Sequence, residues 1–110
     1  MGEVMDNPAE RVLDVLRLRG WSKGESFGPN GQRCVGAACE IPGGMSEPVT
    51  LIARIINEHY ADRTVEHICN TSMATIVSFN DHPDTTFADV ERVLEKAAVK
   101  WEEERVLRND

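Results

Sequence analysis

Two thiols in a segment of small residues are the first candidates for chemistry. The stretch GQRCVGAACEIPGG places Cys34 and Cys39 among glycine, alanine and valine. A cysteine nucleophile needs a position that favours the thiolate, such as a helix N-terminus, and a histidine within reach as its base. His82, in the turn NDHPD, is the candidate base, with Asn80 or Asp81 to orient its ring. No established catalytic signature surrounds Cys34, so a Cys–His enzyme is an alternative rather than the main interpretation.

A zinc site would need a different set of ligands. The thiol and imidazole candidates are Cys34, Cys39, His67 and Cys69. The Cys-x4-Cys spacing is at the loose end of zinc-finger spacing, and His67 and Cys69, two positions apart on a helix, point in different directions. We therefore predict no metal and no other cofactor. Cysteine also behaves as a small apolar residue, and the favoured interpretation is that Cys39 and Cys69 pack in the core.

Polar residues also gather around the NDHPD turn. Asn, Asp and Pro are turn formers, and Thr86 is placed to cap the helix that follows, so local backbone chemistry explains most of this composition. The functional alternative is a polar pocket that combines the turn with the loop after the first predicted helix. Its candidate members are Lys23, Arg33, Asn80, Asp81 and His82.

Helix signals dominate the elements that must position these residues. Asn7 and Pro8 begin a helix that Gly20 ends, and Thr86 with Asp89 forms a capping box for the last one. Apolar residues repeat at helical spacing in four segments. The four main helices are predicted over residues 8–19, 46–63, 64–79 and 86–104. We predict one mainly α domain over residues 1–110, with a core of about 8–104.

The segment between the first two helices is the non-helical part of the prediction. Asn30-Gly31 is a tight-turn signal, and it predicts a small β-hairpin that pairs Ser26 and Phe27 with Gln32 and Arg33. Gly31 should then have a positive φ. The residues CVGAACEI that follow predict a short helix.

The C-terminal tail, residues 105–110, follows the densest run of acids in the chain. Trp101 lies on the apolar face of the last helix and should be at least half buried, whereas the helix should fray beyond Glu104. Val106 and Leu107 are the apolar residues of the tail, and they can dock on the same chain or on a second copy. The sequence therefore leaves open whether the protein forms a homo-oligomer.

Charge and composition exclude several functional classes. The net charge is −7, with 8 acids and 6 bases in residues 1–60 and 11 acids and 6 bases in the remainder. Nucleic-acid binding requires a basic surface, so it is not expected. The chain has no secretory signal or membrane-length apolar run and has 3 cysteines, an odd number, which indicates a soluble cytoplasmic protein. An acidic surface can bind a basic protein partner or mimic nucleic acid.

Three motifs carry a resemblance to a known family. They are GWSKG at residues 20–24, NGQRCVGAA at 30–38 and FNDHPDTTFADV at 79–90. Together they resemble a small family of uncharacterised proteins of actinobacteria and their phages, a domain of unknown function. The resemblance implies an origin rather than an activity. The resulting hypothesis is a small, non-enzymatic, phage-encoded protein that binds a host or phage protein, with the Cys–His enzyme and the acidic nucleic-acid mimic as alternatives.

Overall fold

The computed structural model describes residues 7–25, 27–40, 46–64 and 71–108, and this part of the chain is mainly helical, as predicted. Its elements are α1 (Pro8–Arg19), α2 (Val35–Glu40), α3 (Ser46–His59), the 3-10 turn η1 (Ala61–Arg63), α4 (Ser72–Asp81) and α5 (Phe87–Arg108). Within these ranges no helix is long and apolar enough to cross a membrane.

Helix α1 begins and ends where local chemistry places its caps. The Asn7 side chain accepts hydrogen bonds from the backbone amides of Ala9 and Glu10, and Pro8 follows as the first helical residue. Gly20 closes the helix with φ 92°, a conformation that side-chain-bearing residues rarely adopt. The Asn7 amide also donates to the Ala98 carbonyl at 2.8 Å. The same residue therefore caps α1 and joins its first turn to α5.

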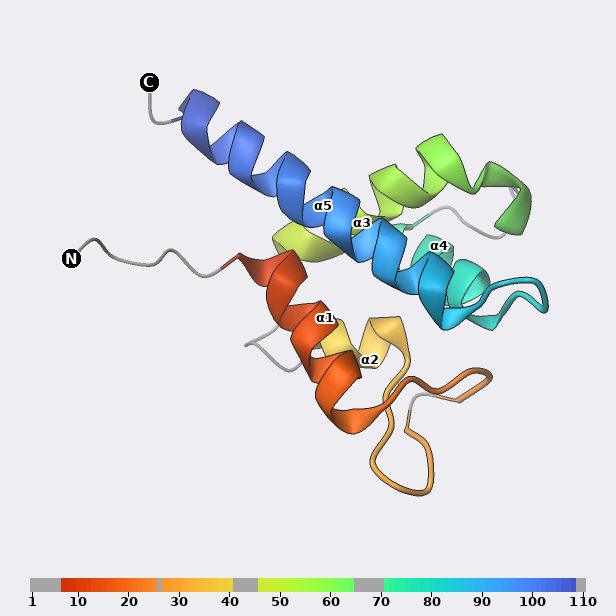
Figure 1. Ribbon diagram of the computed structural model, residues 1–110. Coiled ribbons are helices and arrows are strands. Elements are labelled where there is room, and N and C mark those ends of the chain that lie inside the picture. The colour runs from red at the N-terminus through yellow and green to blue at the C-terminus, as the bar shows by residue number, and fades with distance from the viewer. Residues whose placement is uncertain (1–6, 26, 41–45, 65–70, 109–110) are drawn as a thin grey trace.

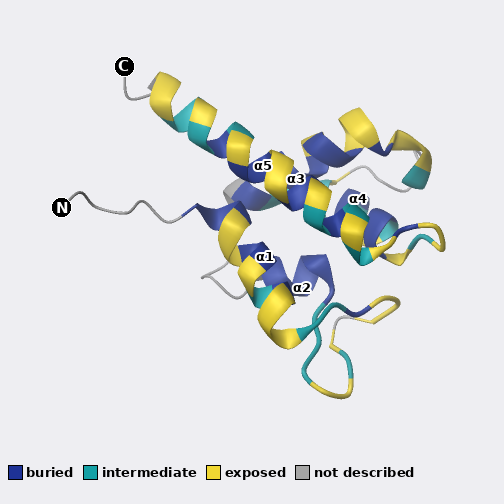
Figure 2. Ribbon diagram, viewed as in Figure 1, coloured by how far each residue is buried: buried dark blue, intermediate teal, exposed yellow. Residues whose placement is uncertain are grey.

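Helix α5 is the long element against which the others are arranged. It packs on α1 along one side and on α3 along the other, while α4 packs on α3 and α2 lies between α1 and α4 (Figure 1). The buried faces of these helices meet in one apolar core (Figure 2). Fully buried members with large side chains are Val12, Leu16, Val35, Ile52, Ile56, Ile76, Phe79, Val90, Val93 and Leu94.

The predicted hairpin is wrong, although its turn forms. Gly31 has φ +85°, as expected, and the Gly28 amide bonds to the Gln32 carbonyl at 2.8 Å. In the described residues, however, Arg33 makes only isolated bridges, antiparallel to Phe27 and parallel to Trp21, and no strand develops. The arm after the turn is shared between two neighbours, so neither pairing extends into a ladder. Ser26 lies outside the described residues.

Three helix boundaries differ from prediction by four residues or more. Helix α3 ends at His59 rather than residue 63, because the chain turns into η1. Helix α4 begins at Ser72, where Thr71 Oγ1 accepts a hydrogen bond from the Ala74 amide at 3.1 Å. Residues 65–70, which contain the candidates His67 and Cys69, lie outside the described part of the chain.

The end of α5 is the third difference. The helix was expected to fray after Glu104, but it continues to Arg108. Arg54 on α3 forms an ion pair with Glu104 at 2.7 Å, and Arg105 forms one with Glu102 at 2.9 Å. These contacts hold the two turns that follow the buried Trp101, whose burial was predicted correctly.

Candidate functional site

Asn80 is the centre of the predicted polar pocket, and it is completely buried. Its Oδ1 accepts hydrogen bonds from Trp21 Nε1 at 2.7 Å and from the Val35 amide at 2.9 Å. Its Nδ2 donates to the Ser22 carbonyl at 3.1 Å and to Asp81 Oδ1 at 2.9 Å. All four hydrogen-bonding positions of the amide are occupied. Asn80 thus joins α4 to the loop after α1 and to the start of α2.

Asp81 joins the same loop to the end of α4, and Lys23 joins it to the turn before α5. Asp81 Oδ1 also accepts from the Gly24 amide at 2.8 Å, and the Lys23 ammonium group donates to the carbonyls of Thr85 at 2.7 Å and Pro83 at 3.3 Å. These polar groups bond to one another and to backbone. The arrangement supports a structural role for the cluster, in agreement with the turn-chemistry interpretation.

Cys34 lies at the start of α2 and is buried. Its Sγ accepts from the Ala37 amide at 3.2 Å, as a helix-capping group does. A cavity of about 130 Å³ adjoins it, lined by Gly24, Glu25, Cys34, Val77, Asn80 and Asp81. The structure therefore brings Cys34, Asn80 and Asp81 together.

His82 takes a different role. Its Nδ1 accepts from the Asp84 amide at 3.1 Å, which closes the turn after α4. Within the described residues, no hydrogen bond joins its ring to Cys34. The geometry that a Cys–His nucleophile requires is therefore not formed.

The structure also shows where the remaining candidate residues from the sequence lie. Arg33 lies over the Phe27 ring, with 4.6 Å from its guanidinium carbon to the ring centroid. Cys39 is buried in the core, as predicted. Across residues 7–25, 27–40, 46–64 and 71–108, no group of three His, Cys, Asp or Glu side chains is arranged to hold a metal ion.

A second polar network lies at the N-terminus of α5, where the sequence indicated only a cap. The Thr86–Asp89 capping box is confirmed, with the Thr86 amide donating to Asp89 Oδ2 at 3.1 Å and the Asp89 amide donating to Thr86 Oγ1 at 3.3 Å. Arg63 adds an ion pair to Asp89 at 3.1 Å. Burial raises the pKa of Asp89, but the hydrogen bonds from Thr86 and Arg63 outweigh this and leave it below the ordinary value of 3.8.

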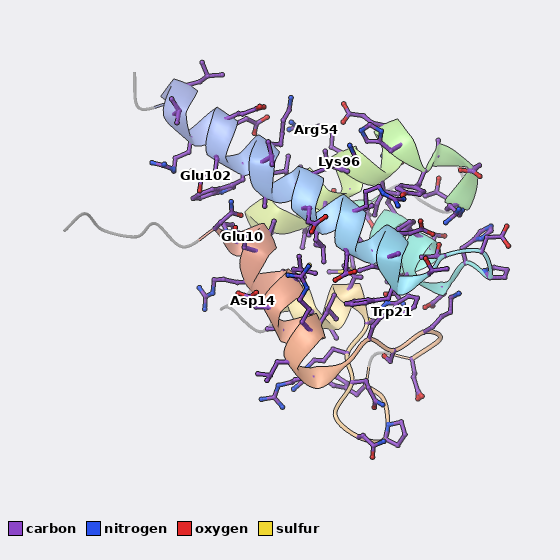
Figure 3. The ribbon with its side chains drawn as sticks, in the orientation of Figure 1. Glu10, Asp14, Trp21, Arg54, Lys96 and Glu102 are labelled. Carbon is purple, nitrogen blue, oxygen red and sulfur yellow. The ribbon has the colours of Figure 1, made fainter. Side chains whose placement is uncertain are left out.

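An acidic groove between α1 and α5, of about 470 Å³, is a feature that the sequence did not reveal. Its lining combines an apolar floor with four carboxylates and one guanidinium: Asn7, Glu10, Leu13, Asp14, Arg17, Glu95, Ala98, Val99 and Glu102. Figure 3 shows Glu10, Asp14 and Glu102 on the α1 side of α5, with Arg54 and Lys96 on the other side.

The carboxylates of this groove differ in their partners. Arg17 neutralises one end of the groove through Glu91 at 3.1 Å and Glu95 at 3.5 Å. Glu10 and Asp14 are exposed and form no ion pair with any other described residue. Their spacing of four residues on α1 was visible in the sequence, but the pairing of α1 with α5 was not.

Comparison with known proteins places the chain in a family. A family model described as "Family of unknown function (DUF6197)" matches residues 8–100. The chain belongs to this family. The predicted resemblance to an uncharacterised family is thereby confirmed, and the DUF6197 match includes all three motifs on which it rested. No curated protein and no solved structure matches the chain. The last two turns of α5 lie beyond the matched residues.

Proposed function

We propose that the protein is a non-enzymatic binding domain whose α1/α5 groove holds a basic, amphipathic segment of another protein. The observation that carries this proposal is the pairing of an apolar floor, Leu13, Ala98 and Val99, with a rim of carboxylates. Val99 is 59% exposed, whereas Leu13 and Ala98 are buried, so Val99 is the part of the floor that a partner can reach. A helix with Leu or Val on one face and Lys or Arg beside it fits this chemistry.

The groove favours this function over an enzyme. Cys34 and His82, the candidate catalytic pair, are each bonded to backbone amides nearby. The carboxylates of Glu10 and Asp14, which form no ion pair among the described residues, instead attract a cationic partner, and opposite charge accelerates association and selects the partner. The family resemblance makes a host or phage protein the expected partner, in the cytoplasm of an actinobacterial cell.

The test is capture of partners from an actinobacterial lysate, with mass spectrometry to identify them. Wild type is compared with Glu10→Lys/Asp14→Lys, which reverses the charge of the rim, and with Asp62→Lys/Asp84→Lys, which makes the same charge change at exposed sites elsewhere. We expect the groove variant to lose the partner and the control to keep it. A photo-crosslinker at Val99 should then join the captured protein directly.

Two results would contradict the proposal. Equal capture by wild type and the groove variant would show that the groove is not used. Equal loss in both variants, with strong dependence on salt, would indicate a diffuse acidic surface and would favour the nucleic-acid mimic.

A further inference from the structure

The two ends of the α1/α5 groove are fixed by contacts between the helices. Near the start of α1, Asn7 donates to the Ala98 carbonyl at 2.8 Å. Near the end of α1, Arg17 lies 3.1 Å from Glu91. The partner on α5 comes earlier in the sequence as α1 advances, so the two helices run antiparallel. The groove between them therefore has an Asn7 end and an Arg17 end.

The Asn7 end carries negative charge that is open to a partner. Glu10 on α1 and Glu102 on α5 line this end, and Asp14 follows one turn farther along α1. Figure 3 shows Glu10 and Glu102 near the start of α1, with Asp14 beyond them. Glu102 is paired with Arg105 at 2.9 Å, whereas Glu10 and Asp14 form no ion pair among the described residues. A cation that enters here meets two carboxylates without such a partner.

The Arg17 end is closed by ion pairs. Nε and a terminal nitrogen of Arg17 both lie 3.1 Å from Glu91 Oε2, and the second nitrogen lies 3.5 Å from Glu95. One guanidinium from α1 thus holds two carboxylates that are one turn apart on α5. Residues seven apart share a face of a helix, so Glu10 and Arg17 lie on one face of α1, about 10 Å apart along its axis. A second cation two turns from the first would therefore meet a guanidinium instead of a free carboxylate.

We propose that Arg17 determines which partner helix the groove accepts. The accepted helix carries its bases at one end only, over Glu10 and Asp14, and an apolar residue over the exposed Val99. A helix with a second set of bases two turns away is rejected, because Arg17 repels these bases and already occupies the nearby carboxylates. This inference rests on the proposed function and names the charge pattern of its partner.

The test uses two synthetic amphipathic helical peptides with leucine along one face. The one-ended peptide has a pair of lysines in its last turn, and the two-ended peptide has a further pair two turns earlier. Fluorescence anisotropy gives the affinity of each peptide for wild type, Arg17→Gln and Arg19→Gln. Arg19→Gln is the matched control, because it removes the same charge from an exposed residue of α1 that does not line the groove. Circular dichroism of each variant controls for folding.

The decisive quantity is the gain in affinity from the one-ended to the two-ended peptide. Arg17→Gln frees Glu91 and Glu95 for the second lysine pair, so its gain should exceed the gain in wild type by about threefold or more. Arg19→Gln should show the same gain as wild type. This double-mutant cycle cancels the general attraction of a chain of net charge −7 for the more basic peptide.

The outcomes separate this inference from the proposed function. Equal gains in wild type and Arg17→Gln overturn the role of Arg17, as do equal gains in Arg17→Gln and Arg19→Gln, which net charge alone would explain. In both cases, weaker binding of the one-ended peptide to Glu10→Lys/Asp14→Lys would still support the proposed function. A wild type that binds neither peptide overturns the charge pattern named here, and capture from the lysate then decides the proposed function by itself.

Discussion

Replacement of Asn80 by alanine should be among the most destabilising single changes in the protein. It removes an amide that fills all of its hydrogen-bonding positions within the protein. It leaves two buried groups, the Val35 amide and the Ser22 carbonyl, and one partly buried group, Trp21 Nε1, without their partner. Each buried polar group left unpaired costs about 1–3 kcal/mol, and the truncated side chain leaves a small void as well. Partial access of water to these groups lowers the total cost, so we expect the free energy of unfolding to fall by about 4 kcal/mol.

The assay is urea unfolding followed by far-ultraviolet circular dichroism. A domain of this size has a free energy of unfolding of about 5–15 kcal/mol in total. Asn80→Ala should therefore move the unfolding midpoint to a much lower urea concentration and lower the Tm by roughly 15 °C or more. Asn57→Ala is the matched control, because Asn57 is an exposed asparagine within α3. It should change the free energy of unfolding by less than about 0.5 kcal/mol.

Asn80→Asp sharpens the interpretation. The substitution keeps the acceptor for Trp21 and Val35 but replaces the donor to Asp81 with an oxygen, which brings two carboxylates together. We expect destabilisation at neutral pH that shrinks when the pair is protonated. A loss below about 1 kcal/mol for Asn80→Ala would refute the account of Asn80 as the joint between α4, α2 and the loop after α1.

Two further predictions concern α5 and the glycine turns. The folded pKa of Asp89 lies below its ordinary value, so its contribution to stability should be complete above that value and decline as pH falls through the folded pKa. Asp89→Asn should remove this acid-dependent part of the unfolding free energy, whereas Arg63→Ala should shift the loss to higher pH. Gly20→Ala and Gly31→Ala both force alanine into a positive φ, but at Gly20 the new Cβ also meets Gln32 Cγ at 2.9 Å, and at Gly31 nothing lies within 4 Å. Thermal melts should therefore show about 1 kcal/mol lost at Gly31 and clearly more at Gly20, and equal losses would contradict the steric argument.

Features determined by neighbouring residues were predicted well from the sequence. The caps at Asn7 and Gly20, the Thr86–Asp89 box and the positive φ of Gly31 all depend on bonds within one turn of chain. The hairpin was predicted on the same local grounds, and it was wrong because the pairing of Arg33 is decided by Trp21 as well as by Phe27.

The site depended on contacts between distant segments. The sequence placed Asn80 in a turn, but its partners come from residues 58 and 59 positions earlier and from the start of α2. The acidic groove exists only because α1 and α5 pack together. Helical spacing of Glu10 with Asp14 identified neither the partner helix nor the floor between them.

The two tryptophans lie in contrasting environments. The Trp21 indole N–H is bonded to Asn80, whereas the buried indole N–H of Trp101 has no hydrogen-bond partner within the described residues. The Arg105 guanidinium carbon lies 5.8 Å from the centroid of the Trp101 ring. Their two indole resonances in a nitrogen-15 spectrum should be well separated and should exchange with solvent at different rates. The Trp21 signal reports on the hydrogen bonds around Asn80, and the Trp101 signal reports on the start of the last two turns of α5. Residue-specific observation of both regions therefore needs no added label beyond the isotope.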